Sequence, residues 1–325
     1  MGFIMRHEGI VWDNHACLPF AGTERWLPEL ARFRRAGADA VTVNIGDAEV
    51  PLEVLNRMAQ AIRRFVQANP DDYVLGLTTA DLRAARASGR LAVCLDIEGV
   101  HAFGGDASLV EHFYRLGVRW MLPVYNRRNL AGGGCHDAED GGLTAHGRAI
   151  LAEMDRVGMI KCCSHAGYRT AREILDSSDR PVIFSHSNPR ALHDHPRNIP
   201  DDLIRACAAT GGVVGINGVG LFLGNRSPTA ADVVRHADYV ARLVGARHVA
   251  IALDTLFDTG AFRQPGGPDP AIWPPEWGYG SGSENLPPEA LPGIADGLSR
   301  LGHADEDVRG IMGENLMRVA EAVWK

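Results

Sequence analysis

The sequence predicts a (β/α)8 barrel, and three observations lead to this fold class. Eight short apolar runs rich in β-branched residues alternate with amphipathic segments along most of the 325 residues. The runs are continuously apolar, as expected for parallel strands that are covered on both faces. A doubly wound open sheet is the alternative, but GVGLFLG from Gly218 misses the G-x-G-x-x-G spacing by one residue, and no helix signal follows it.

The expected elements follow one another in strand and helix order. The eight strands are expected at residues 9–15, 39–45, 91–99, 119–126, 158–165, 181–186, 211–217 and 248–254. The clearest helix lies within residues 143–158, where Thr144 is the expected N-cap and Gly158 the expected stop. Residues 199–212 and 229–245 show the same helical spacing of apolar side chains.

A long segment rich in Pro, Gly and Trp follows the last strand, at residues 257–288. A loop of this length in a compact domain is usually functional, so we expect it to be a pocket wall at the C-terminal end of the barrel. Within it, Trp273, Trp277 and Tyr279 are candidates for covering the pocket. Helical residues from 288 to 325 complete the chain, and no linker divides residues 1–325, which predicts a single domain.

The composition excludes several classes of function. The chain is 46% hydrophobic and 22% charged, with a net charge of -7 and no run of basic residues, so no nucleic-acid partner is expected. No apolar stretch approaches the ~20 residues that span a bilayer, and the N-terminus lacks a signal-peptide pattern. The six cysteines are scattered without a C-x-x-C pair, so no disulfide framework is expected. A cytoplasmic enzyme is the expectation.

Polar residues that bind metals or move protons recur at the C-terminal ends of the expected strands. They are His15, Cys17, Glu98, Tyr125, Asn126, His165, His186 and Asp254. Each of them alone is more often structural, but together they would meet at the end of a barrel that carries active sites. Buried imidazoles and carboxylates that converge are unfavourable unless a cation or hydrogen bonds compensate them. Zinc accepts nitrogen, oxygen and thiolate ligands, so the pattern favours a metal site.

Several longer motifs closely resemble the renal (membrane) dipeptidase family of zinc peptidases, in its bacterial cytoplasmic branch. They are DIEGVH, LTAHGRAILAEMDRVGM, SHAGYRTAREIL, FSHSNPRALHDHPRNIPDDLIRA and RGIMGENLMRVAEAVW, in this order along nearly the whole chain. The resemblance implies an amidohydrolase-type barrel with two zinc ions bridged by a glutamate and a hydroxide. It further implies hydrolysis of dipeptides, many of them with a C-terminal D-residue, by a homodimer.

The resemblance assigns roles to individual residues. Glu98 matches the bridging glutamate, His15 the first-site histidine, and His165 and His186 the second-site histidines. Arg197, in HPRN, matches the arginine that binds the substrate carboxylate, and Asp254 the catalytic acid/base. Tyr125 stands where the animal enzymes have the histidine that polarises the scissile carbonyl, a place where bacterial relatives have tyrosine, and its hydroxyl can donate a hydrogen bond there. Asn126, beside it, is a further candidate for contact with substrate.

Two departures from the family pattern bear on the metal. Cys17 replaces the aspartate of the H-x-D motif, and Cys162 replaces the aspartate that precedes the first S-H pair. Three interpretations of Cys17 are open. It is a thiolate ligand of the first metal; or the first metal binds weakly or not at all and the enzyme uses one zinc; or dipeptidase activity has been lost. The retention of the other site residues favours an active zinc dipeptidase. The alternatives are an amidohydrolase on another small carboxylate-bearing amide and a non-catalytic metal-binding protein.

Overall fold

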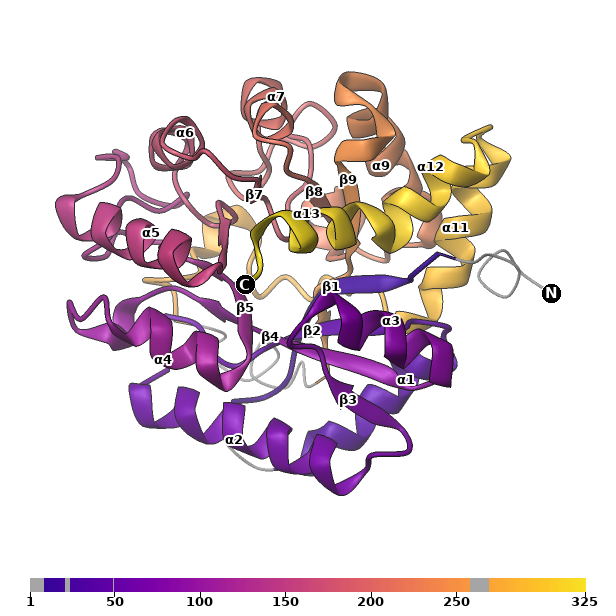
Figure 1. Ribbon diagram of the computed structural model, residues 1–325. Coiled ribbons are helices and arrows are strands. Elements are labelled where there is room, and N and C mark those ends of the chain that lie inside the picture. The colour runs from indigo at the N-terminus through magenta and orange to yellow at the C-terminus, as the bar shows by residue number, and fades with distance from the viewer. Residues whose placement is uncertain (1–8, 21–23, 49, 258–268) are drawn as a thin grey trace.

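In the computed structural model, the eight expected strands form one parallel sheet that curls into a nearly closed barrel (Figure 1). The structure describes residues 9–20, 24–48, 50–257 and 269–325. In their order across the sheet, the strands are β7 (Val182–Ile183), β6 (Ile160–Cys162), β5 (Val118–Leu122), β4 (Leu91–Glu98), β2 (Ala40–Asn44), β1 (Trp12–Cys17), β9 (Val249–Ala252) and β8 (Val214–Asn217). A parallel bridge between Phe184 and Val214 brings the two ends of this order together.

Two further strands were not expected from the sequence. The short strands β3 (Tyr73–Leu75) and β10 (Thr255–Leu256) pair with β4 and β1, respectively. Each has three residues or fewer. A run of that length carries too few positions for a periodic pattern to stand out. The barrel order is unaffected, because both strands lie off its main path.

Most of the helices surround the barrel on its outer side, whereas α13 lies across one end of it (Figure 1). The helices are α1 (Ala31–Arg35), α2 (Leu52–Ala68), α3 (Thr79–Ser88), α4 (Leu109–Leu116), α5 (Ala145–Val157), α6 (Tyr168–Asp176), α7 (Asp201–Ala209), α8 (Gly220–Leu223), α9 (Ala230–Val244), α11 (Leu291–Arg300), α12 (Asp305–Arg309) and α13 (Asn315–Val323). The expected caps of α5 are confirmed, because the Thr144 side chain accepts from the Gly147 amide and Gly158 adopts a left-handed conformation. Among the described residues, none of these helices is long and apolar enough to cross a membrane.

The interior of the barrel is filled by large and small side chains from neighbouring strands. Trp12 on β1 lies opposite Ala40 on β2, which in turn lies opposite Ala92 on β4. The large indole therefore occupies space that the two alanines leave open, and its Nε1 donates to Thr42 Oγ1 at 3.0 Å. Trp120 on β5 is likewise 1% exposed. This packing fixes which face of each strand points inward, and so which residues meet at the strand ends.

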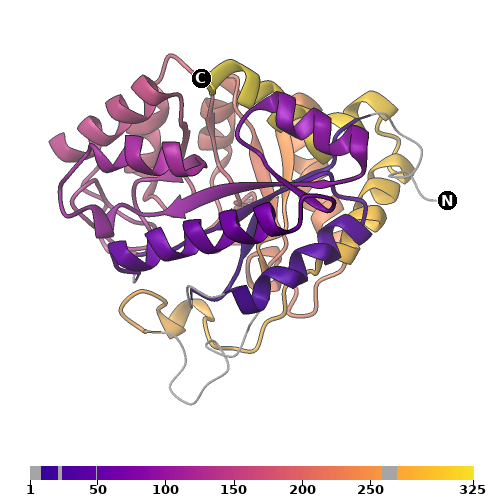
Figure 2. The ribbon, with the colours of Figure 1, turned by 60° about the horizontal axis from the view of Figure 1, so that its bottom comes forward.

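The two ends of the barrel are occupied by different parts of the chain. The C-terminal residues cover the end where the strands begin, because Glu314 accepts from the Ile10 amide at 2.9 Å and Trp324 packs edge-on against Trp12. Residues 269–287 lie at the opposite end, as Figure 2 shows. The expected loop at 257–288 is thus at the C-terminal end of the strands, although its residues 258–268 lie outside the described part of the chain.

Candidate metal centre

The residues predicted from strand ends meet around one cavity of about 130 Å³. Of the nine predicted site residues, seven line it, namely Cys17, Glu98, Tyr125, His165, His186, Arg197 and Asp254. His15 and Asn126 are fully buried and do not line the cavity. The rest of the lining is mainly apolar, including Leu221, Phe222 and Trp273. The arrangement is a polar floor at the strand ends under an apolar wall, as is usual for a small-molecule site.

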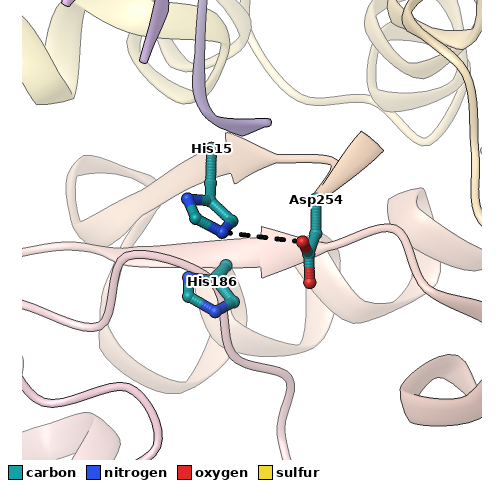
Figure 3. Close-up of side chains that lie close together, drawn as sticks. All are labelled: His15, His186 and Asp254. Carbon is teal, nitrogen blue, oxygen red and sulfur yellow. Dashed lines mark ion pairs between the residues drawn. The ribbon is translucent and has the colours of Figure 1, made fainter. Parts of the chain in front are cut away.

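Three imidazoles point their Nε2 atoms at one carboxylate oxygen. Glu98 Oε1 lies 3.6 Å from Nε2 of His15, 3.4 Å from Nε2 of His165 and 3.1 Å from Nε2 of His186. The rings of His15 and His186 stack with their centroids 4.1 Å apart, and His15 Nε2 lies 3.6 Å from Asp254 Oδ1 (Figure 3). Five chain segments far apart in sequence therefore place donor atoms within one small volume.

The outer nitrogen of each ring has its own partner. Nδ1 of His15 lies 3.1 Å from Asp96 Oδ2, and Nδ1 of His165 lies 2.7 Å from Asn126 Oδ1. These partners are acceptors, so both Nδ1 atoms carry the proton and both Nε2 atoms present a lone pair to the centre. Nδ1 of His186 lies 2.7 Å from the Ser185 hydroxyl. Such outer partners are typical of metal-binding histidines.

The donor set fits a cation. Nε2 of His165 and Nε2 of His186 are 2.9 Å apart, and Glu98 Oε1 is buried without a hydrogen-bond partner. Burial raises the pKa of Glu98 well above its usual value, and it lowers the pKa of His165 and of His186 well below theirs. Neutral imidazoles facing one another beside a buried carboxyl are a poor arrangement by themselves. A positive ion among them would satisfy all three groups at once.

The donors form three overlapping triplets. They are His15, Cys17 and Glu98; Glu98, His165 and His186; and His15, His186 and Asp254. The ligand atoms within each triplet all lie within 4.8 Å of one another. Glu98 belongs to the first two triplets and lies where they meet. Three nitrogen, oxygen or sulfur donors with one side open to a cavity are typical of a catalytic zinc position.

Cys17 is placed as a donor despite its departure from the family pattern. Its Sγ lies 3.4 Å from His15 Nε2 and 3.6 Å from Asp254 Oδ1. Burial raises the pKa of the thiol, so without a cation the sulfur keeps its proton. A bound metal ion would reverse this, because coordination removes the proton from a thiol. By contrast, Cys162 is buried and donates to the Ser185 hydroxyl at 3.0 Å, beneath the centre.

Two residues on the cavity wall have chemistry suited to a substrate. Arg197 is 2% exposed, its Nε has no hydrogen-bond partner, and its Nη2 donates to the His186 carbonyl at 3.3 Å. Tyr125 stacks on the His165 ring with centroids 4.1 Å apart, and burial raises the pKa of its hydroxyl well above its usual value. The tyrosine hydroxyl therefore stays protonated and can donate a hydrogen bond.

Backbone conformation at the site is unusual. Among the described non-glycine residues, three have positive φ, namely Asn126 at 52°, His165 at 66° and Asp254 at 56°. Each lies in the loop shortly after a barrel strand, namely β5, β6 and β9, respectively, and each was predicted as a site residue. Left-handed backbone at non-glycine residues persists where surrounding structure enforces it, and it is common at functional sites. The turns thus aim these side chains back over the strand ends.

Some supporting residues were not predicted. Asp96 holds His15, and Asn217 Nδ2 donates to Asp254 Oδ2 at 2.9 Å. His136, which lies between α4 and α5, contacts Tyr279 through an Nε2 to hydroxyl distance of 2.9 Å. A signal existed for two of them, because Asp96 shares a strand face with Glu98 and Asn217 is the last residue of β8. Nothing in the sequence around His136 marked it.

A parallel barrel with imidazoles and a shared carboxylate at its strand ends is the architecture of the amidohydrolase-type metal proteins. The family model described as membrane dipeptidase, peptidase family M19, matches residues 40–269. The chain therefore belongs to the membrane dipeptidase family, which confirms the resemblance drawn from the sequence motifs.

Individual relatives agree with this placement. The chain is 30% identical to dipeptidase verJ of Clonostachys rogersoniana, over 81% of this chain and 63% of that protein, and 31% identical to dipeptidase aclJ of Aspergillus oryzae, over 79% and 58%. The chain thus spans about three fifths of the length of these relatives. Among solved structures, an amidohydrolase from Pseudomonas aeruginosa is 29% identical with a TM-score of 0.84, covering 98% of this chain and 97% of that one.

A second solved structure supports the fold alone. It is a metallo peptidase from Rhodobacter sphaeroides liganded with a phosphinate mimic of the dipeptide L-Ala-D-Ala, and it is 21% identical with a TM-score of 0.79. The match covers 98% of this chain and 100% of that chain. The predicted fold class, a (β/α)8 barrel, is therefore confirmed both by the strand order and by the solved relatives.

Proposed function

We propose that the protein is a zinc-dependent dipeptidase that cleaves the amide bond of small dipeptides with a free C-terminal carboxylate. The observation that carries this proposal is the convergence of three imidazole Nε2 atoms on Glu98 Oε1 at the floor of a cavity that also holds Arg197. Family membership and the names of the relatives support the reaction class. The mimic bound by the Rhodobacter sphaeroides protein suggests that D-residues at the C-terminal position be tested as well.

Two zinc positions are proposed, sharing Glu98. His15 and Cys17 would complete the first position, and His165 and His186 the second. Bound zinc would supply Lewis acidity, which polarises a carbonyl group and lowers the pKa of water toward ~7. The thiolate of Cys17 replaces one anionic ligand by another, so the charge of the first position is preserved.

Asp254 is proposed as the group that moves the proton. Its side chain is 14% exposed at the cavity, and Asn217 Nδ2 fixes its Oδ2. The other oxygen, Oδ1, can accept a proton from the attacking water and return it to the leaving amine nitrogen, since a poor leaving group must be protonated as the C–N bond breaks. The left-handed backbone of Asp254 directs the carboxylate toward this place.

Arg197 and Tyr125 are proposed to hold the substrate. The guanidinium of Arg197 can bind a free C-terminal carboxylate with two parallel hydrogen bonds, which selects for short peptides with an unblocked end. The protonated hydroxyl of Tyr125 can donate to the carbonyl oxygen as negative charge develops on it. The apolar wall formed by Leu221, Phe222 and Trp273 would receive the side chains.

The experiment that tests this function is a hydrolysis panel. Purified protein with zinc supplied is incubated with L,L and L,D dipeptides, their C-terminal amides and their N-acetyl forms, and the products are quantified by mass spectrometry. The free dipeptides are expected to be hydrolysed much faster than their C-terminal amides. Turnover of the N-acetyl forms without turnover of the free dipeptides would instead favour an amidohydrolase on another small carboxylate-bearing amide, for which the replacement of the family aspartate by Cys17 is the relevant observation.

A further inference from the structure

A short stretch of the long loop is fixed over the cavity by side chains from other loops. We call residues 271–279 the cover segment; its Trp273 and Tyr279 line the cavity. Four side chains anchor it. Arg127 donates to the Ala271 carbonyl at 2.7 Å, and Asn126 donates to the Ile272 carbonyl at 3.3 Å. His195 lies 3.0 Å from the Trp277 carbonyl, and His136 lies 2.9 Å from the Tyr279 hydroxyl. Two of these anchors are adjacent residues on the β5 side of the metal centre.

The Asn126 amide contacts both the metal centre and the cover segment, and its oxygen also accepts from Cys135 Sγ at 3.6 Å. Its Oδ1 lies 2.7 Å from Nδ1 of His165, while its Nδ2 donates to the Ile272 carbonyl. A carbonyl oxygen can only accept, so the amide nitrogen must face Ile272 and the amide oxygen must face His165. The same orientation therefore sets the His165 tautomer, with the proton on Nδ1 and the lone pair of Nε2 directed at the centre.

The backbone around Asn126 prevents the two contacts from moving separately. Asn126 and His165 both have left-handed backbone, with φ of 52° and 66°. The intervening residues 134–136 join them, since the Cys135 amide donates to the His165 carbonyl and the His136 amide donates to the Asn126 carbonyl, both at 2.9 Å. Gly134 allows this close approach, because a Cβ there would lie 2.2 Å from the Asn126 carbonyl oxygen.

We propose that Asn126 is a positioning residue that couples the cover segment to the metal centre. An ion held by His165 restrains that ring, the ring restrains the Asn126 amide, and the amide restrains Ile272 in the cover segment. By linkage, a closed cover segment also favours the metal-binding orientation of His165. This inference rests on the proposed function for the identity of the ion. The sequence led us to expect that Asn126 contacts substrate. Asn126 does not line the cavity, so the inference gives it a role behind the residues that do.

Two variants separate the contacts of Asn126, and a third is the control. Asn126→Asp keeps an oxygen acceptor for His165 Nδ1 and loses the donor to Ile272. Asn126→Ala loses both. Asn129→Asp makes the same chemical change in the same loop, where the Asn129 side chain instead bonds the Pro123 carbonyl and the Ala131 amide, both at 2.7 Å.

The readouts are zinc affinity, by competition with a chelating dye, and hydrogen exchange of peptides covering residues 269–279, with and without zinc. In wild type and Asn129→Asp, zinc is expected to slow exchange of the cover segment. Asn126→Asp is expected to keep zinc affinity within about threefold but to lose this protection. Asn126→Ala is expected to lose about 10- to 100-fold in zinc affinity, the usual effect of removing a partner of a metal-binding histidine, and to lose the protection as well.

The inference and the proposed function fail in different ways. Equal zinc-induced protection of the cover segment in Asn126→Asp and wild type would overturn the coupling while leaving the dipeptidase proposal intact. Wild-type zinc affinity in Asn126→Ala would overturn the positioning of His165. Wild-type protein that binds no zinc would overturn the proposed function and its metal. In metal-free protein the cover segment of Asn126→Asp should still exchange faster than that of Asn129→Asp, and equal rates would show that the bond to Ile272 does not hold it.

Discussion

Replacing Arg197 by alanine should abolish most recognition of a free carboxylate. The guanidinium is 2% exposed, lies 5.3 Å from the Phe222 ring centre and has an Nε without a partner, so it has donors available to a ligand in a site shielded from water. Two charge-assisted hydrogen bonds of about 1.5–3 kcal/mol each correspond to a loss of roughly 10²- to 10⁴-fold in kcat/KM for Arg197→Ala. Arg197→Lys keeps the charge but not the planar arrangement of donors, so its kcat/KM should lie between those of wild type and Arg197→Ala.

The assay compares a dipeptide with its own C-terminal amide. Wild type should prefer the free carboxylate strongly, and Arg197→Ala should turn over the two substrates at nearly the same low rate. The amide is the internal control, because a variant that is merely misfolded loses activity on both substrates by the same factor. Near-wild-type kcat/KM of Arg197→Ala on the free dipeptide, or an unchanged preference for it, would refute the carboxylate role of Arg197.

Three further predictions concern the reaction, packing and pH. Asp254→Asn should lower kcat by about 10²- to 10⁴-fold while zinc content stays at the wild-type level, and full activity would exclude it as the proton carrier. Gly134→Ala should destabilise the fold by about 1–3 kcal/mol, because its Cβ would lie 2.2 Å from the Asn126 carbonyl oxygen; Gly141→Ala, where the nearest atom is 3.7 Å away, is the control in urea unfolding. Burial lowers the pKa of His236 to about 4, below the usual 6.5, so the unfolded chain binds more protons between these values and stability falls as pH drops. From pH 7 to pH 5 this amounts to about 2 kcal/mol, and His236→Leu should lose less over the same range; equal losses would contradict this.

The sequence was sufficient for the fold because its strands are buried on both faces. Most of the barrel strands are mainly apolar and almost fully buried, and such runs are recognisable without tertiary information, although β1 also carries Asp13, Asn14 and His15. β3 was missed because its stability comes from pairing with β4 rather than from its own three residues. The caps of α5 were predictable because Thr144 and Gly158 act locally.

The strand pattern could group the site residues that lie at or near strand ends, and Arg197 was found only through the HPRN motif. His15, Glu98, His165 and His186 could be grouped because parallel strands bring their ends together. The role of Asn126 could not, since it depends on a backbone turn and on a loop that lies more than 140 residues further along the chain. His136 and His195 hold the cover segment through contacts that no local pattern encodes.

The measurement that tests the central claim most directly is zinc per chain, by elemental analysis of tag-free protein prepared under reducing conditions with zinc available. The account predicts two equivalents for wild type, and about one for Cys17→Ala, in which the second position formed by Glu98, His165 and His186 is intact. One equivalent in wild type that is kept by Cys17→Ala and lost by His165→Ala would contradict the thiolate position. Absence of bound zinc from wild type would contradict the metal centre altogether.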